Sequence, residues 1–232
     1  MTIPYLAPAV TDSPAAAGVY PPQQDSQLLV YAMDTTGLVP GARVLDICTG
    51  SGFVAIAAAE LGAGSVTAFD VCPRAVHCSR GNAVHAGVDV DVREGSWTRA
   101  HECGPFDLVV CNPPYVPTPP DGDTKVIPHT AGPSRAWNAG ADGRLLLDPL
   151  CHAVFDLLDD GGSALLVHSE LAGTEKSLYA LRKSGLHAEV VVSQIIPFGP
   201  VMSARAGWLE EIGLIPHGRR TEELIVIRAD KR

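Results

Sequence analysis

The sequence is short of positive charge and of long apolar runs. Lys and Arg together number 17 against 26 Asp and Glu, which gives a formal net charge of −9. Proteins that bind duplex nucleic acid usually carry a basic surface, so this balance disfavours a nucleic-acid partner. No run of about 18 apolar residues occurs, so we expect no membrane span. The N-terminal segment has no basic stretch followed by an apolar core, so we also expect no secretory signal peptide.

The sequence also lacks the C-x-x-C pairs typical of zinc sites and the G-x-S-x-G motif that carries the nucleophilic serine of many hydrolases. Six cysteines are present, but none forms a C-x-x-C pair, so we expect no metal site. Several lie in apolar runs, where cysteine packs as a small hydrophobic residue. We therefore expect reduced thiols and a cytoplasmic location. No G-x-S-x-G motif occurs, which argues against Ser-His-Asp hydrolysis.

Strand-like and helix-like segments alternate through most of the chain. Continuous or alternating apolar patterns predict strands at 42–48, 65–71, 88–95, 106–112, 163–169, 188–196 and 223–230. Helical patterns fall at 24–36, 53–64, 73–87, 143–162 and 172–184. This order predicts an α/β domain in which a seven-stranded, mostly parallel sheet carries helices on both faces.

The same pattern predicts one domain with two irregular segments. Residues 1–20 are rich in Pro, Ala and Ser and are expected to form a flexible arm, which leaves 21–232 as the domain. Residues 116–142 hold many Pro and Gly residues and predict a long loop on the substrate side. Residues 197–222 predict an insertion before the last strand, with a short helix over 204–213.

The segment VLDICTGSGFVAIA (44–57) places a strand, a glycine turn and a helix in order. Gly50 and Gly52 allow a ligand to approach the backbone, and with Ala55 they fit the dinucleotide pattern G-x-G-x-x-A. Asp46, at the end of the strand, would repel a pyrophosphate and suits a cationic group. Asp70 ends the next strand and can accept hydrogen bonds from ribose hydroxyls. A ligand with a ribose and an amine but no phosphate fits best, which indicates S-adenosylmethionine.

The predicted cofactor pocket extends along this edge of the sheet. Ser96 and Trp97 follow the third strand, where the edge and face of an adenine can be met. The expected cofactor-binding residues of these strand ends are Asp46, Cys48, Thr49, Gly50, Gly52, Asp70, Val71, Ser96, Trp97 and Asn112. His168, at the end of the fifth strand, is a further candidate for the same crevice.

The segment VVCNPPY (109–115) ends a buried strand with one amide and two prolines. Pro113 and Pro114 have no backbone N–H, so the acceptors that remain are the Asn112 side-chain oxygen and backbone carbonyls. Tyr115 adds a flat apolar face. Such a group can hold a planar –NH2 and orient its weakly nucleophilic lone pair. We therefore predict catalytic roles for Asn112, Pro113 and Tyr115, and methyl transfer to a planar nitrogen.

These segments resemble the class I S-adenosylmethionine-dependent methyltransferases with an NPPY motif. The resemblance is closest to the HemK-like glutamine methyltransferases of release factors, in the short branch without an N-terminal helical domain. VYPPQQDSQLL (19–29) is similar to the segment that covers the cofactor, so the resemblance adds Tyr20, Asp25 and Ser26 to the expected cofactor-binding residues. SRAWNAGADGR (134–144) is similar to the segment at the substrate entrance. The resemblance implies a Rossmann-like methyltransferase fold and a glutamine amide bound by Asn112, Pro114, Tyr115 and Trp137. It also implies S-adenosylhomocysteine as product.

The chain departs from the family pattern at several positions. Cys48 stands where the family has its first loop glycine, Ser96 where an acid is usual, and Gln23 and Gln24 where acids are frequent. Some short members work with a small zinc-binding partner, and the third-strand edge at 88–95 can serve for such an activator. The other functions considered are methylation of a small-molecule or peptide amide or amine in specialised metabolism, methylation of the adenine exocyclic amine, a nicotinamide-dependent oxidoreductase, and a non-catalytic binding module.

Overall fold

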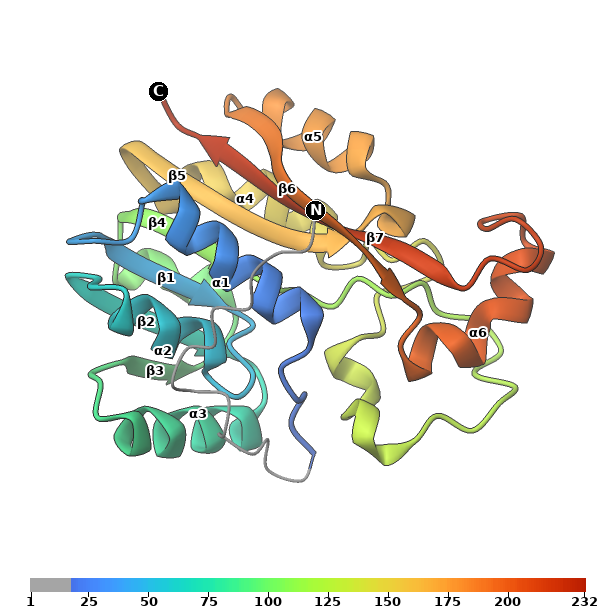
Figure 1. Ribbon diagram of the computed structural model, residues 1–232. Coiled ribbons are helices and arrows are strands. Elements are labelled where there is room, and N and C mark those ends of the chain that lie inside the picture. The colour runs from blue at the N-terminus through green and yellow to red at the C-terminus, as the bar shows by residue number, and fades with distance from the viewer. Residues whose placement is uncertain (1–17) are drawn as a thin grey trace.

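The computed structural model describes residues 18–232 and contains one mixed sheet of seven strands, in the order β3-β2-β1-β4-β5-β7-β6. The strands are β1 (Arg43–Ile47), β2 (Ser65–Asp70), β3 (Asp91–Glu94), β4 (Phe106–Cys111), β5 (Leu158–Ser169), β6 (His187–Pro197) and β7 (Thr221–Asp230). Only β7 runs antiparallel to its neighbours β5 and β6. The predicted mostly parallel, Rossmann-like architecture is therefore confirmed (Figure 1).

Helices cover both faces of the sheet (Figure 1). They are α1 (Gln24–Thr36), α2 (Phe53–Glu60), α3 (Pro73–Ala86), α4 (Leu147–Leu157), α5 (Thr174–Lys183) and α6 (Pro200–Glu211). One apolar core joins α1, α2 and α3 to the sheet, and a second joins α4, α5 and the short helix η2 (Trp97–Glu102) to the opposite face. Because both faces are buried, most residues of the central strands are apolar.

Local sequence signals explain several element ends. Gly37 follows α1 with φ 64°, and Gly87 follows α3 with φ 69°, a left-handed conformation that favours glycine. Pro73 occupies the first turn of α3, where a missing N–H costs nothing. These ends agree with the predicted helices.

The boundary between α4 and β5 differs from the prediction. A helix was expected over 143–162, but α4 ends at Leu157 and β5 begins at Leu158. Leu158 pairs with Phe106 of β4, and an irregularity in the register lies between Phe106 and Leu108. Sheet hydrogen bonds therefore override the helical pattern of these residues, and the last five predicted helical residues are strand. In the predicted insertion, α6 begins at Pro200, ahead of the expected residue 204.

The predicted N-terminal arm is described only in its last three residues, 18–20, and residues 1–17 lie outside the described part of the chain. Val19 is buried in a small cluster with Cys72, Ala75 and Cys78 of the α3 region. The segment just before α1 therefore packs on the domain, and the described fold starts three residues earlier than the expected boundary at residue 21.

Residues 116–142 and α6 pack on each other and form a unit at one end of the sheet, here called the loop–helix unit. Its apolar contacts include Val116, Trp137 and Leu209. Arg205 of α6, only 2% exposed, donates to Asp123 Oδ1 (2.6 Å) and to the Pro117 carbonyl (2.7 Å). The two segments that the sequence set apart as irregular are thus joined by one buried arginine.

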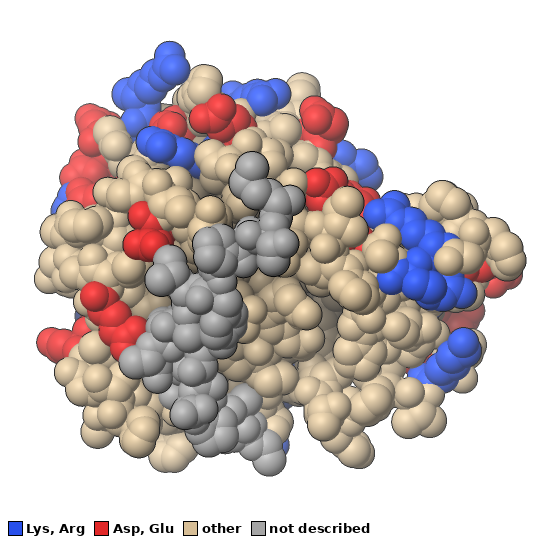
Figure 2. Space-filling model, viewed as in Figure 1, with Lys and Arg blue, Asp and Glu red and all other residues tan. Residues whose placement is uncertain are grey.

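Charged side chains are unevenly spread over the face seen in Figure 2. Lys and Arg gather on the side of α6 and the turn after it, where Arg219 and Arg220 lie. Arg219 pairs with Glu170, and Arg220 pairs with Glu210 at 2.6 Å. These acids neutralise much of the local positive charge, which leaves little for a phosphate backbone.

Candidate functional site

The carboxyl ends of three neighbouring strands bring the predicted site residues into one row. Ile47 of β1 pairs with Phe69 of β2 and with Cys111 of β4. The next residue on each strand is therefore Cys48, Asp70 or Asn112, and the three emerge side by side. The crevice beyond the carboxyl ends of a parallel sheet is the usual ligand site in such folds.

A cavity, here called the main cavity, opens at this row. Of the predicted residues, its lining includes Tyr20, Ser26, Asp46, Cys48, Thr49, Gly50, Asp70, Val71, Ser96, Trp97, Asn112 and Pro114. Asp25 and Gly52 do not line it, and neither do Pro113, Tyr115 and Trp137. The structure therefore places most of the predicted cofactor residues around one space.

Asp46 is the buried carboxyl of the main cavity. It is 1% exposed, and Oδ2 has no hydrogen-bond partner among residues 18–232. Burial raises the pKa of Asp46 to about 7, and the nearby charge of Asp70 contributes to the rise. A carboxylate in such a position gains most from a cationic ligand group, because an unpaired buried charge is costly.

The two glycines of the turn have different roles. A Cβ on Gly50 would meet only the Cys48 carbonyl, at 3.9 Å, so its bare backbone faces open space. A Cβ on Gly52 would lie 2.4 Å from Ser79 Oγ of α3. The prediction that Gly52 faces a ligand therefore differs from the structure, where this glycine lets α2 and α3 approach. Cys48 adopts φ 61°, a left-handed conformation suited to the glycine that the family pattern has there.

Asp70 shapes the glycine turn as well as facing the main cavity. Its Oδ2 accepts a hydrogen bond from the Gly50 N–H (2.9 Å), and Oδ1 accepts one from the Cys72 N–H (2.8 Å). Each carboxylate oxygen has capacity for a further donor. Asp70 can therefore hold the turn and accept ligand hydroxyls at the same time.

A chain of hydrogen bonds fixes the orientation of Asn112. Its Nδ2 donates to Ser26 Oγ (3.2 Å), and no group within residues 18–232 donates to its Oδ1. The Ser26 N–H donates in turn to Asp25 Oδ1 (2.7 Å). Because one N–H of the amide donates to Ser26 Oγ, the –NH2 group of Asn112 points toward Ser26. The side-chain oxygen is therefore left to accept a hydrogen bond from a donor in the main cavity.

Asp25 is the centre of this series of hydrogen bonds. It was predicted to bind the cofactor directly, but it does not line the main cavity. It is 4% exposed, and its Oδ2 accepts hydrogen bonds from the hydroxyls of Tyr20 (3.0 Å) and Tyr115 (3.1 Å). Burial and the Asp25 charge raise the pKa of both tyrosines well above the usual value. Asp25 thus positions Ser26 and two tyrosines from behind the main cavity.

Some lining residues were not among the predicted site residues, although two of them lie in the segment 134–144 that the resemblance assigned to the substrate entrance. Pro133, Arg135 and Ala136 come from the loop–helix unit and close one side of the main cavity. Arg135 Nη2 lies 2.8 Å from Cys72 Sγ, so this loop reaches across to the start of α3. Nothing in the local pattern of a Pro- and Gly-rich loop indicates which strand end it will cover.

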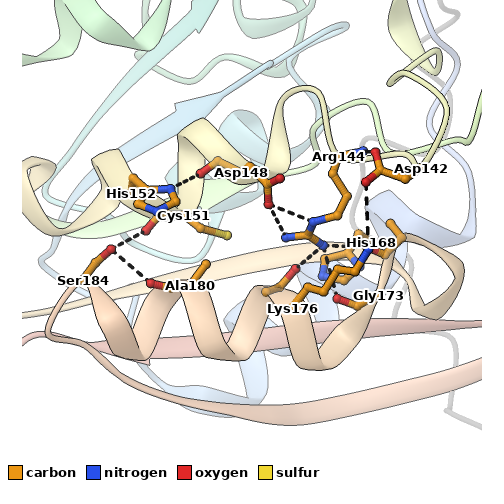
Figure 3. Close-up of polar contacts among 12 residues, drawn as sticks. Asp142, Arg144, Asp148, Cys151, His152, His168, Gly173, Lys176, Ala180 and Ser184 are labelled. Atoms are coloured by element: carbon orange, nitrogen blue, oxygen red, sulfur yellow. Dashed lines mark hydrogen bonds and ion pairs between the residues drawn. The ribbon is translucent and has the colours of Figure 1, made fainter.

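His168 does not belong to the site. It is fully buried on β5, and its Nδ1 lies 2.8 Å from the Ser169 carbonyl. It does not line the main cavity. Figure 3 shows it among the polar groups around Arg144, between α4 and α5. Burial lowers the pKa of His168 to about 4, so it is a neutral part of the core.

Two features of residues 18–232 bear on membrane and metal functions. No helix within 18–232 is long and apolar enough to cross a membrane. In the same range no three or more His, Cys, Asp or Glu side chains are grouped as a metal site would need.

The chain is similar to known methyltransferases in sequence and in fold. Residues 16–125 match the family described as "Methyltransferase small domain". "Methyltransferase HEMK2" of Homo sapiens is 33% identical over 189 residues, which cover 78% of this chain and 85% of that protein. "Release factor glutamine methyltransferase" of Deinococcus radiodurans is 36% identical over 176 residues, 75% of this chain. The match covers 62% of that relative, so this chain spans under two thirds of its length.

A solved structure supports the same fold. It is the E. cuniculi Mtq2-Trm112 complex, described as methylating the eRF1 translation termination factor. It aligns with a TM-score of 0.60 and 20% identity, and the match covers 93% of this chain and 99% of that one.

Proposed function

This chain belongs to the HemK-like class I methyltransferases, and from that premise we propose that it transfers a methyl group from S-adenosylmethionine to the side-chain amide of a release-factor glutamine. The observation that carries the proposal is the orientation of Asn112. Ser26 takes its –NH2, so its oxygen is offered to an N–H donor at the end of β4. A primary amide has two such hydrogens. When both donate to fixed acceptors, the lone pair of the planar nitrogen is directed toward the methyl group.

The residues of the main cavity fit the cofactor. Asp46 would hold the amino group, Asp70 the ribose hydroxyls, and Ser96 and Trp97 the adenine. The unpartnered oxygen of Asp46 and the open space beside Gly50 support this assignment. When bound, S-adenosylmethionine supplies an electrophilic methyl group on a sulfonium, and S-adenosylhomocysteine is the product.

The chain's own residues act by positioning. Asn112 Oδ1 and a neighbouring backbone carbonyl accept the two amide hydrogens, while the Tyr115 ring supports the amide plane. With the cofactor bound, the held amide nitrogen would form its bond to the methyl carbon as the methyl–sulfur bond breaks, and the positive charge would pass from sulfur to nitrogen. The extra proton on nitrogen leaves afterwards, so no strong general base is required. Alignment of this kind can supply up to roughly 7–11 kcal/mol of the barrier reduction.

The transfer assay tests this function directly. The protein is incubated with methyl-labelled S-adenosylmethionine and an intact release factor, and the label is located by mass spectrometry. We expect one methyl group on the glutamine of the Gly-Gly-Gln segment, and none on a release factor in which that glutamine is glutamate. Label on a small-molecule amine, on adenine or on another side chain would contradict the acceptor and favour one of the alternative methylations.

Asp46 gives a prediction on pH. Because the pKa of Asp46 is raised to about 7 and a cationic amine favours its ionised form, cofactor affinity should fall as pH drops below 7. Loss of up to about tenfold per pH unit is expected for one proton. Asp46→Asn should bind about tenfold or more weakly and lose this pH dependence. Calorimetric titration measures both.

The control for this titration is 5′-methylthioadenosine, which has the ribose and adenine but no amino group. Its affinity should be the same for wild type and for Asp46→Asn at every pH. If it weakens as much as S-adenosylmethionine does, Asp46 supports the turn and does not bind the amine.

Two further parts of the proposal concern partners and location. The edge strand β3 has an exposed outer border, and we propose it as the surface for a small zinc-binding activator, a role that the Mtq2-Trm112 complex supports by analogy. A cytoplasmic location fits six free cysteines and a release-factor acceptor.

A further inference from the structure

A second cavity adjoins the main one, and the proposed reaction uses only the Tyr115 ring from its wall. Tyr20 lines both cavities, and Tyr115 lines the second. The rest of the wall comes from the start of α1, from the loop–helix unit and from the paired ends of β6 and β7, including Gln24, Asp25, Trp137, Met202 and Glu222. A group bound there would therefore sit next to an acceptor held at Asn112.

Two polar atoms of this wall have no hydrogen-bond partner among residues 18–232: Glu222 Oε2 and Trp137 Nε1. Glu222 is 5% exposed and Trp137 is 6% exposed. An unpaired buried polar atom costs about 1–3 kcal/mol. One of these atoms accepts a hydrogen bond and the other donates one, so the pair is complementary to a ligand that carries both an N–H and a C=O.

The surroundings of Glu222 offer it no cation. Burial raises the pKa of Glu222 to about 7, the Ser169 hydroxyl opposes the rise, and the charges of Asp25 and Glu170 add to it. Arg219 lies near enough to oppose the shift, but its guanidinium is paired with Glu170. The tyrosine hydroxyls of this region donate to Asp25.

Trp137 is held in a fixed plane. The Arg205 guanidinium lies 4.7 Å from the centre of its ring, and Arg205 is itself fixed by Asp123. The Trp137 carbonyl accepts a hydrogen bond from the Val116 N–H (2.9 Å), which anchors the backbone beside the NPPY segment. The indole N–H is thus a positioned donor. Val116 and Met202 are apolar parts of a wall that also contains Gln23, Gln24 and Asp25.

We propose that this second cavity is a subsite for a backbone-type amide of the acceptor, whose N–H donates to Glu222 and whose C=O accepts from Trp137. The inference deepens the proposed function and rests on it, because it makes the acceptor a peptide whose chain is read beside the methylated side chain. A small-molecule amine would use only one of the two atoms.

Tryptophan N–H signals give a direct test, since the chain has only three tryptophans. The 15N-labelled protein, saturated with S-adenosylhomocysteine, is titrated with N-acetylglycine N-methylamide, and the indole signals are followed by NMR. Trp137→Phe identifies the Trp137 signal. We expect that signal to move saturably, and Glu222→Leu to weaken the fitted affinity by about fivefold or more. The matched controls Trp208→Phe and Glu223→Gln should leave the affinity unchanged.

The alternative outcomes are distinct. A Trp137 signal that stays in place, or an affinity that Glu222→Leu does not change, would overturn the subsite. So would an equal response to n-butylammonium, which would mark a cation site. The titration needs no methyl transfer, so it can succeed when the glutamine assay fails, or fail when that assay succeeds. As a second readout, Trp137→Phe should raise the KM for the release factor with little change in kcat.

Discussion

Asn112→Ala is expected to lower turnover by about 10²- to 10³-fold while the affinity for S-adenosylmethionine stays within about tenfold. The side chain borders the main cavity and is only partly buried, so its removal leaves no large void in the core. Its oxygen accepts nothing within residues 18–232, so the loss falls on the acceptor. Single-turnover kinetics with saturating cofactor, together with calorimetry, separates the two effects.

The comparison variant is Asn82→Ala, which removes an amide that supports the glycine turn. Asn82 Nδ2 donates to the Ser51 carbonyl at 2.8 Å and does not reach the acceptor. This variant should weaken cofactor binding and leave turnover at saturation nearly unchanged. If Asn112→Ala behaves in the same way, Asn112 supports the cofactor pocket and does not hold the acceptor.

Asp25→Asn is expected to have the second largest effect, a fall of about 10- to 100-fold in turnover. The substitution keeps the size of the side chain but removes the charge on which two tyrosine hydroxyls and the Ser26 N–H converge. Because Asp25 does not line the main cavity, cofactor affinity should change by less than about threefold. Steady-state kinetics and calorimetry measure this pair of values.

A double-mutant cycle shows whether Asp25 acts through Asn112. If it orients Ser26 and so Asn112, the Asp25→Asn, Asn112→Ala double variant should be hardly slower than Asn112→Ala alone. Independent roles would give the product of the two single effects. A drop in the unfolding temperature of Asp25→Asn that accounts for its lost activity would instead make Asp25 a purely structural residue.

Periodicity was sufficient for most of the fold. Strands such as β1 and β4 are mostly apolar because both faces of the sheet are covered, and glycines mark the ends of α1 and α3. The α4–β5 boundary was missed because its outcome depends on a pairing partner distant in sequence, Phe106. A local pattern contains no information about that partner.

Site residues could be predicted from the sequence where a functional side chain lies at the carboxyl end of a strand. Asp46, Asp70 and Asn112 each lie at or just beyond the carboxyl end of a recognisable strand, so their convergence follows from parallel pairing. Asp25 and Gly52 were predicted to contact the cofactor, but neither lines the main cavity. A sequence shows that a residue is close to a motif, but it does not show whether that residue faces the cavity. Glu222 lies in a segment with no motif, and only the tertiary fold brings it to the same cavity as Tyr115.

The central claim is that Asn112 presents its oxygen to an acceptor amide, and a crystal structure with S-adenosylhomocysteine and a glutamine peptide tests it most directly. We predict that the glutamine nitrogen lies within about 3.2 Å of Asn112 Oδ1, with the Tyr115 ring against the amide plane. A peptide whose glutamine amide binds elsewhere, or an Asn112 that turns its –NH2 toward the ligand and its oxygen toward Ser26, would contradict the account.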